Sequence, residues 1–306
     1  MRNPIRRNRN IGTAKQGHKR QNRFVVPESR HNPEPFCHQL GEHTQVIRKV
    51  NQKDYCFLVE HARTDSCHAC TIDDLVTMLS LLDPGSLEGI QLIVLRQPKR
   101  KEETLCPVWG RLRYYFERPP YSGVAIILEA IDYSKRLEWP KRLTVEETKE
   151  LKRLVRDGHH FQELKRVYTA PFNLEAVRAT QLYRTLLHEL GHYQQYVKVV
   201  KQPLHRLEEQ IAVLEELVDW ESDDECSHFK RLMTLTDEYN AVYEHVWKQY
   251  DCLSKQEKEK YAFGYSARLR SQLEQDHKIP FPRKVSAESL LRDSLREEDF
   301  LVRVGE

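Results

Sequence analysis

"RTLLHELGHYQQY", residues 184–196, contains the pattern His-Glu-x-x-His at His188, Glu189 and His192. Residues four apart on a helix lie on one face, about one turn from each other. Two imidazoles at this spacing can bind one metal ion at roughly 2.0–2.1 Å. Glu189 points partly away from the two histidines, so its carboxylate can act on a metal-bound water instead of on the metal. The stretch therefore predicts a helix that carries two zinc ligands and a general base.

The surroundings of the pattern matter, because a chain of this size contains it by chance in roughly one case in twenty. Leu186, Leu187 and Leu190 surround it at helical spacing. Gly191 costs about 0.5–1 kcal/mol relative to Ala in the middle of a helix, but it leaves room for another segment to approach closely. These features favour a metal site over the alternative, an accidental pattern in an interaction module.

The stretch resembles the active-site helix of zincin metallopeptidases, especially the gluzincin group and the compact ImmA/IrrE-like proteins. In that family the third zinc ligand is a Glu on a later helix. Residues 254–269, "SKQEKEKYAFGYSARL", offer such a helix. The resemblance covers the helices at 173–200 and 254–270, and covers the rest only as general architecture, a β-rich half followed by the active-site helix.

Two glutamates compete for the role of third ligand. Glu257 follows Ser254 at the spacing of a capping box, which would occupy its side chain at the start of the helix. Glu259 shares an apolar face with Phe263 and Ser266, and that face is expected to pack inward. We therefore predict Glu259 as the third ligand, with Glu257 as the alternative. The family pattern has small or Asp/Asn residues where this chain has the next two residues, Lys and Tyr, so the register of the ligand stays open.

The resemblance implies a zinc-dependent metallohydrolase, most simply a peptidase. His188, His192 and Glu259 would hold Zn²⁺, and Glu189 would take a proton from the bound water and give it to the leaving amine. Zincins align a peptide or protein substrate along a sheet edge, and residues 108–132 are the candidate for that edge. The alternative is a zincin-like regulatory or binding protein that keeps zinc with little or no turnover.

The N-terminal half is expected to hold most of the strands. Apolar and alternating runs predict strands at 54–62, 89–98, 108–118 and 123–132, the last two as a hairpin. A helix is expected at 71–82, with Thr71 and Asp74 as its N-terminal cap pair.

The pattern becomes helical from about residue 143. The expected helices are one that Thr144 caps and Gly158 ends, a long one at 173–200 that stops near Pro203, and three at 204–220, 229–249 and 254–275. Strands followed by helices predict an α+β fold, with a small mixed β-sheet in the N-terminal half and a helical half that carries the active-site helix. The expected divisions are an arm at 1–35, a β-rich subdomain at 36–142, a helical metal-binding subdomain at 143–278 and a peripheral tail at 279–306.

The first 30 residues carry most of the positive charge. They contain nine Arg or Lys and one acid, whereas the whole 306-residue chain has a formal net charge of +3. We expect residues 1–35 to be a disordered arm, either a solubility tail or a segment that contacts the phosphates of a nucleic acid. A transit peptide is a third reading, although the arm lacks an amphipathic stripe. There is no run of 18 apolar residues and no apolar N-terminal leader, so we expect a cytoplasmic protein without a membrane partner.

Other chemistry-bearing residues have mundane readings. Cys67 and Cys70 could bind a structural zinc with Cys37 and His38, or act as a redox pair, but reduced inert thiols are the simpler prediction. Residues 207–229 hold nine Asp or Glu and no Lys or Arg. These carboxylates, such as Glu215 and Glu216, could supply the third ligand or select basic substrates, but a solvated helix face is the simpler prediction.

Four tyrosines are expected near the metal site, and any of them could stabilise a developing oxyanion. The sequence does not choose among them, and packing is the simpler role for each. They are Tyr193, Tyr196, Tyr261 and Tyr265.

Overall fold

The structure is a computed structural model that describes residues 40–105, 108–118, 121–217 and 227–302. The expected arm at 1–35 lies outside these residues, as do Cys37, His38 and the end of the acidic stretch after residue 217.

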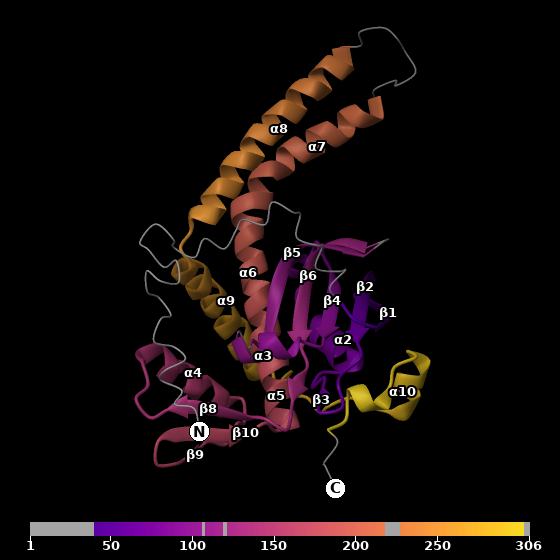
Figure 1. Ribbon diagram of the computed structural model, residues 1–306. Coiled ribbons are helices and arrows are strands. Elements are labelled where there is room, and N and C mark those ends of the chain that lie inside the picture. Colours follow the sequence, from indigo (N-terminus) through magenta and orange to yellow (C-terminus); the bar gives the residue numbers. More distant parts are fainter. Residues whose placement is uncertain (1–39, 106–107, 119–120, 218–226, 303–306) are drawn as a thin grey trace, which may run out of the picture. The chain divides into compact units, whose positions relative to one another are not determined.

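A five-stranded mixed sheet forms most of the N-terminal half (Figure 1). In spatial order its strands are β1 (His43–Val50), β2 (Lys53–Glu60), β4 (Ile90–Arg96), β6 (Tyr121–Glu129) and β5 (Gly110–Arg118). Strands β2, β4 and β6 are parallel, and the outer strands β1 and β5 are antiparallel to their neighbours. The apolar run at 89–98 becomes the central strand because both of its faces are buried.

The predicted hairpin is confirmed, since β5 pairs antiparallel with β6. Among the described residues β6 is the only strand that pairs with β5, so β5 lies at the edge of the sheet. Figure 1 shows β5 as the strand nearest to the helix that carries the His-Glu-x-x-His pattern.

Helix α2 (Ile72–Ser80) connects the parallel strands β2 and β4. It begins at the predicted cap, where Thr71 and Asp74 form a reciprocal capping box. A 3₁₀ turn, η3 (Pro84–Leu87), then leads into β4, and α3 (Arg100–Leu105) follows that strand.

The stretch predicted as one helix at 173–200 is helical throughout but not uniformly α-helical. It comprises α5 (Leu174–Thr180), the π-helical segment η4 (Gln181–Leu186), α6 (Leu187–Tyr196) and a second π-helical segment, η5 (Val197–Lys201). The predicted stop near Pro203 is wrong, because α7 (Gln202–Leu217) continues the helix through it. The proline lies in the first turn of α7, directly after a π-helical segment whose altered hydrogen bonding accommodates the missing N–H.

Two further long helices follow, α8 (Ser227–Cys252) and α9 (Lys255–Gln275), as the sequence predicts. Helix α8 packs along α7, and α9 packs along α6 (Figure 1). One apolar core joins α2 and α6 to the sheet face that carries Phe57, Ile93 and Ile126. These three residues lie in register on adjacent parallel strands.

A second, three-stranded sheet has two of its strands in the region expected to be helical. Its strands are β8 (Arg136–Pro140), β10 (Val167–Pro171) and β9 (Gln162–Glu163), in that order across the sheet. Between β8 and β9 runs α4 (Val145–Arg156), which Thr144 caps as predicted. A two-stranded pair, β3 (Ser66–Cys67) with β7 (Ile131–Asp132), completes the strands of the described residues.

The C-terminal segment is part of the core, in contrast to the peripheral tail expected at 279–306. It contains α10 (Ala287–Arg292) and the 3₁₀ turn η6 (Glu297–Asp299). Leu290 and Phe300 are buried in the main core. The backbone N–H of Ala62 donates to Asp299 Oδ1 at 2.8 Å, which ties this segment to the end of β2.

The fold is therefore α+β, with a mixed sheet in the N-terminal half and a largely helical C-terminal half. In the part of the chain that the structure describes, no helix is both long and apolar enough to cross a membrane.

Candidate metal centre

His188 and His192 lie one turn apart on α6 and face each other. Their Nε2 atoms are 3.1 Å apart. Both side chains are largely buried, with 12% and 15% of their surface exposed. Burial, followed by the neighbouring His188, lowers the pKa of His192 to about 4. Both effects favour the neutral imidazole, which is the form that binds a metal ion.

Glu259 on α9 completes the group. Its carboxylate oxygens lie 3.3 Å from His188 Nε2 and 3.9 Å from His192 Nε2. The hydrogen bond from His188 is the main reason that the pKa of Glu259 is below its ordinary value. Glu257 instead closes the capping box of α9, with its own N–H bonded to Ser254 Oγ at 3.2 Å. The structure thus brings together His188, His192 and Glu259, the three residues predicted as ligands. The alternative ligand, Glu257, has its side chain in the capping box instead.

The spacing of the three donors fits a small tetrahedral ion. A tetrahedron with bonds of roughly 2.0–2.1 Å has edges of about 3.3–3.4 Å. The separation of the two Nε2 atoms, 3.1 Å, and that of His188 Nε2 from Glu259 Oε2, 3.3 Å, lie close to that edge, whereas the 3.9 Å from His192 Nε2 is measured to the other carboxylate oxygen, Oε1. Among the described residues this is the single group of three or more His, Cys, Asp or Glu side chains that could hold a metal ion. Two imidazoles with one carboxylate are donors that zinc accepts, although the geometry alone does not select the metal.

Gly191 allows the close approach of α9 to α6 that brings Glu259 to the histidines. A Cβ atom at this position would lie 2.8 Å from the Cα of Ala262 and 2.9 Å from its carbonyl oxygen. Neither atom belongs to a side chain that could move aside. The prediction that a small residue at position 191 leaves room for another segment to approach closely is therefore confirmed.

Glu189 lies beside the group but is not part of it. The residue is 8% exposed, and the backbone N–H of Leu112 on β5 donates to its carboxylate. Burial raises the pKa of Glu189 to about 7, with a smaller opposite effect from His188 and a further rise from Glu259. A carboxyl with a pKa in this range can both accept and donate a proton near neutral pH.

Aromatic and cationic neighbours fix the orientation of the first histidine. The Phe263 ring lies 4.4 Å from the His188 ring between centroids, and the Arg153 guanidinium lies 3.9 Å from the Phe263 centroid. Phe263 is on the inward face of α9 predicted for Glu259, together with buried Ala262 and Ser266.

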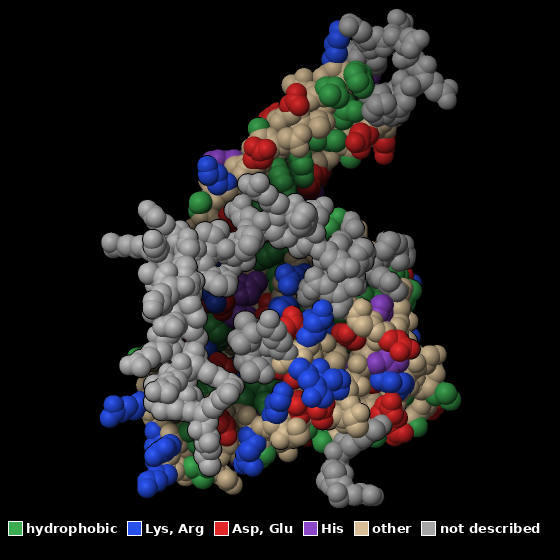
Figure 2. Space-filling model, in the orientation of Figure 1, with side chains coloured by type: hydrophobic (Ala, Val, Ile, Leu, Met, Phe, Trp, Pro, Cys, Tyr) green, Lys and Arg blue, Asp and Glu red, His purple; other side chains and the backbone are tan. Residues whose placement is uncertain are grey.

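A cavity of about 730 Å³ opens next to the metal group. His188, Glu189 and Glu259 form part of its wall. Figure 2 shows histidine side chains set back in a hollow on this face, with basic and acidic side chains mixed beside it. Much of the remaining wall comes from the start of β5, from β8, from α4 and from η4.

Most residues of this wall could not be predicted from the sequence to line a cavity. Trp109, Trp139 and Phe172 line the cavity. Trp139 belongs to the small sheet that the sequence pattern did not predict, and Phe172 directly follows the last strand of that sheet. Arg184, one turn before His188, also lines the cavity, although the sequence predicted no role for it.

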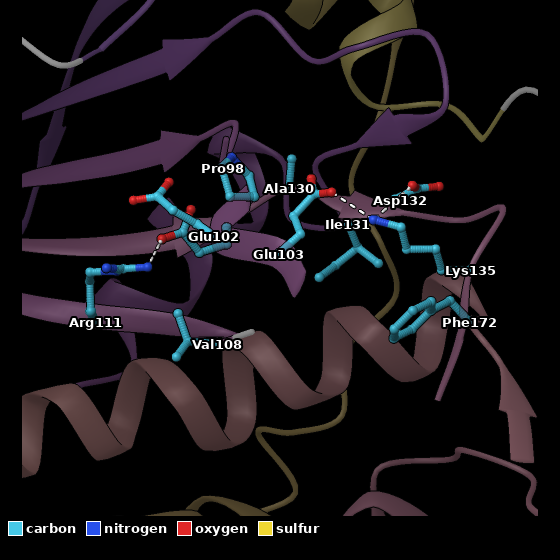
Figure 3. A pocket seen from close by; sticks show the side chains of 11 residues that line it. Pro98, Glu102, Glu103, Val108, Arg111, Ala130, Ile131, Asp132, Lys135 and Phe172 are labelled. Carbon is cyan, nitrogen blue, oxygen red and sulfur yellow. Dashed lines mark hydrogen bonds and ion pairs between the residues drawn. The ribbon is translucent and has the colours of Figure 1, made fainter. Parts of the chain in front are cut away.

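A smaller pocket of about 90 Å³ adjoins the cavity and shares Val108 and Phe172 with it. Its polar wall is internally paired. Figure 3 shows the Lys135 ammonium reaching both Glu103, at 2.7 Å, and Asp132, at 3.3 Å. The Arg111 guanidinium lies 2.8 Å from Glu129 in the same pocket.

None of the four candidate tyrosines is in the described wall of the cavity. Tyr193 donates its hydroxyl to the carbonyl of Glu88, and Tyr196 packs in an aromatic cluster with Trp247. The simpler prediction, a packing role, fits both.

The cysteines of the Cys-x-x-Cys motif are buried free thiols. Burial raises the pKa of Cys67 to about 11 and raises that of Cys70 still further. Thiols of high pKa form little of the reactive thiolate. The arrangement fits the prediction of inert thiols, while Cys37 and His38 lie outside the described residues.

The acidic stretch does not reach the metal group in the part that the structure describes. Glu215 and Glu216 are exposed on the last turn of α7. Neither belongs to the metal-binding group. This fits the prediction of a solvated helix face.

Comparison with known proteins gives no relative from which a function could be transferred. No protein-family model, no curated protein and no solved structure matches the chain. Only the geometry of the site therefore bears on the function of this chain.

Proposed function

We propose that the protein is a zinc-dependent metallohydrolase of the zincin type, and that it hydrolyses peptide bonds. The observation that supports this most strongly is the convergence of His188, His192 and Glu259, whose possible ligand atoms lie within 4.8 Å of one another, with Glu189 next to them. His188 and His192 would supply Nε2 atoms and Glu259 a carboxylate oxygen. Zinc held there lowers the pKa of a water molecule towards neutrality and polarises a carbonyl group.

Glu189 supplies the acid–base chemistry in this proposal. Its carboxylate is adjacent to the metal-binding group but is held by the N–H of Leu112, so it stays clear of the ligand set. In its ionised form it accepts a proton from the attacking water, and it then delivers that proton to the leaving amine. Its burial and the neighbouring Glu259 carboxylate both favour its return to the protonated form after the first transfer.

Strand β5 aligns the peptide in this proposal. It is the edge strand of the sheet among the described residues, and its Leu112 N–H points towards Glu189. An extended peptide can add to such an edge as a further strand, because the backbone groups supply hydrogen bonds regardless of its sequence. Addition at this edge brings a peptide carbonyl next to the metal-binding group.

A peptide library digested by the zinc-loaded protein tests the proposal. We expect the wild type to cleave some peptides and Glu189→Gln to lose at least 100-fold of that activity while keeping its zinc, since a general base contributes roughly 10²–10⁴-fold. The matched control is Glu257→Gln, an exposed glutamate outside the metal group. Zinc binding without any Glu189-dependent cleavage would instead favour a zincin-like binding protein.

A further inference from the structure

The region formed by β8, α4, β9 and β10, residues 136–171, has an excess of positive charge. It contains nine Lys or Arg and six Asp or Glu, whereas the rest of the chain from residue 40 onward contains 31 Lys or Arg and 38 Asp or Glu. Figure 2 shows several Lys and Arg side chains at the lower left, where Figure 1 shows α4, β8 and β9. The positive charge is thus local to this small-sheet region.

Four of these cations lie at one end of the small sheet. Lys165 and Arg166 occupy the turn that joins β9 to β10. The backbone N–H of Lys141 donates to the carbonyl of Arg166 at 3.3 Å, and Arg142 follows directly in the chain. All four side chains are exposed, and we call this group the basic end.

Helix α4 carries three more exposed cations on its outward face. Lys149, Lys152 and Arg156 are spaced by three and then four residues, so they lie in one stripe along the helix. The opposite face, with the buried Leu154, packs inward. Because α4 begins three residues after Arg142, the stripe continues from the basic end.

These cations are available to an external anion. Lys141 lies 2.7 Å from Glu163, but both side chains are exposed. Exposed ion pairs stabilise little, so another anion can replace the carboxylate. Four of the cations form no ion pair in the part of the chain that the structure describes: Arg142, Lys152, Lys165 and Arg166.

The surface fits the phosphates of a duplex better than an unpaired strand or a membrane. Unpaired bases stack on exposed aromatic rings, whereas Trp139, Phe161 and Tyr168 of this region are half-buried. A helix that lies on a membrane turns its apolar face to the lipid, whereas α4 turns its cations outward. Its exposed Val145 and Val155 stand singly among charged residues. Duplex phosphates require only exposed cations that are spread along a surface.

We propose that the basic end and the α4 stripe bind a nucleic-acid duplex through its phosphates, without reading its base sequence. Helix α4 has 12 residues and is therefore roughly 18 Å long, which matches about five base pairs of a duplex. The four unpaired cations make the main contacts. The inference does not rest on the proposed peptidase function, because none of these residues belongs to the metal group.

Fluorescence anisotropy of the full-length protein with labelled duplexes of about 20 base pairs, one of DNA and one of RNA, tests the proposal. With about four phosphate contacts, we expect the dissociation constant to rise roughly 100-fold between about 50 and 200 mM salt. A DNA duplex of unrelated sequence should bind within about threefold of the first, since phosphates carry no sequence information.

Charge-reversal variants assign the binding to this surface. Lys165→Glu combined with Arg166→Glu should weaken binding at least tenfold and lower the slope of log affinity against log salt by about two. The matched control is Lys198→Glu combined with Lys201→Glu, which makes the same change in net charge at exposed positions of η5. It should stay within about threefold of the wild type. The basic first 30 residues are unchanged in every variant.

A second pair of substitutions keeps the test valid if the variant of the turn does not fold. Arg142→Glu combined with Lys152→Glu changes the other two unpaired cations, which lie outside that turn. This variant should also weaken duplex binding at least tenfold. Thermal unfolding shows which variants are folded.

Loss of DNA or RNA duplex binding in these variants, with retention in the control, supports the proposal. Equal weakening in the variants and the control overturns it, and so does a wild type that binds neither duplex. Tighter binding of an unpaired strand than of the duplex contradicts the duplex partner. Sedimentation with vesicles of phosphatidylcholine and phosphatidylserine tests the membrane, and binding to vesicles without binding to a duplex also overturns the proposal.

Discussion

At the residue scale, Gly191 decides whether the metal group can form. It is a point of close approach between α6 and α9, with backbone atoms of Ala262 less than 3 Å from where a Cβ would lie. A side chain there would push α9 outwards and withdraw Glu259 from the histidines. The sequence could predict the need for a small residue, because glycine is unfavourable in a helix without such a reason.

Gly191→Ala is expected to lower zinc affinity at least tenfold, measured by competition with a chromogenic chelator. Gly264→Ala is the control, since its Cβ would meet only the flexible end of Arg268, at 3.5 Å. That variant should bind zinc like the wild type and gain up to about 1 kcal/mol of stability from helix propensity. Wild-type zinc affinity in Gly191→Ala would show that the helices separate without cost to the site.

Glu189 gives the zinc-free protein a pH-dependent stability. Its pKa rises from an ordinary value near 4.5 to about 7 in the folded state, mainly through burial. The folded protein therefore binds the proton more tightly than the unfolded chain, and stability is lost as the pH rises through that interval. Since one pKa unit corresponds to about 1.4 kcal/mol, the full loss is about 3 kcal/mol.

Urea unfolding of zinc-free wild type and Glu189→Gln at pH 5 and pH 8 measures this effect. We expect the variant to gain up to about 3 kcal/mol on the wild type between the two pH values. The lowered pKa of His192 is common to both proteins and largely cancels in the comparison. A difference that stays constant with pH would contradict the burial of an ionisable Glu189.

At the scale of elements, the sequence predicted the residues at which helices start more accurately than the positions of the helices relative to one another. The capping boxes at Thr71 and Ser254 are formed as predicted, because a cap depends only on residues three apart. The continuation of the helix through Pro203 was missed, because π-helical bonding before a proline leaves no local pattern. The proximity of Glu259, not Glu257, to the two histidines was predictable, since Glu257 is occupied by the cap, but the packing of α9 along α6 was not.

Asp157, at the end of α4, links the elements that position the site. Its fully buried carboxylate accepts hydrogen bonds from Arg270 on α9, at 2.6 Å, and from Thr180 at the end of α5, at 3.0 Å. It also lies 2.9 Å from Arg184 in η4. One carboxylate thus links Arg184, in the segment directly before α6, to Arg270 on α9, the helix that carries Glu259.

Asp157→Asn is expected to cost about 3 kcal/mol of unfolding free energy, because it removes the one fully buried counter-charge of two buried guanidinium groups. Arg184 then keeps only Glu150 as its acidic partner and Arg270 only Glu274, and both of these carboxylates are more exposed than Asp157. Glu274→Gln is the matched control. This glutamate also pairs with Arg270, at 2.9 Å, but its side chain is 34% exposed. Its loss should cost under about 1 kcal/mol. Equal losses in the two variants, measured by chemical denaturation, would argue against a special role for the buried carboxylate.

At the scale of the whole molecule, the sequence indicated the chemistry of the site but not its surroundings. His188, Glu189, His192 and Glu259 could be chosen from helical spacing, a cap and a family resemblance. The small sheet of β8, β9 and β10 could not, because its strands are only two to five residues long and partly exposed. The cavity walls depend in part on that sheet, so the cavity became visible only in the structure.

The central claim is that His188, His192 and Glu259 bind one zinc ion. Zinc content by mass spectrometry of the wild type, Glu259→Ala and Glu257→Ala tests it most directly. We expect about one zinc per chain in the wild type and in Glu257→Ala, and less than about a tenth of that zinc content in Glu259→Ala. A wild type without zinc, or loss of zinc in Glu257→Ala with retention in Glu259→Ala, would contradict it.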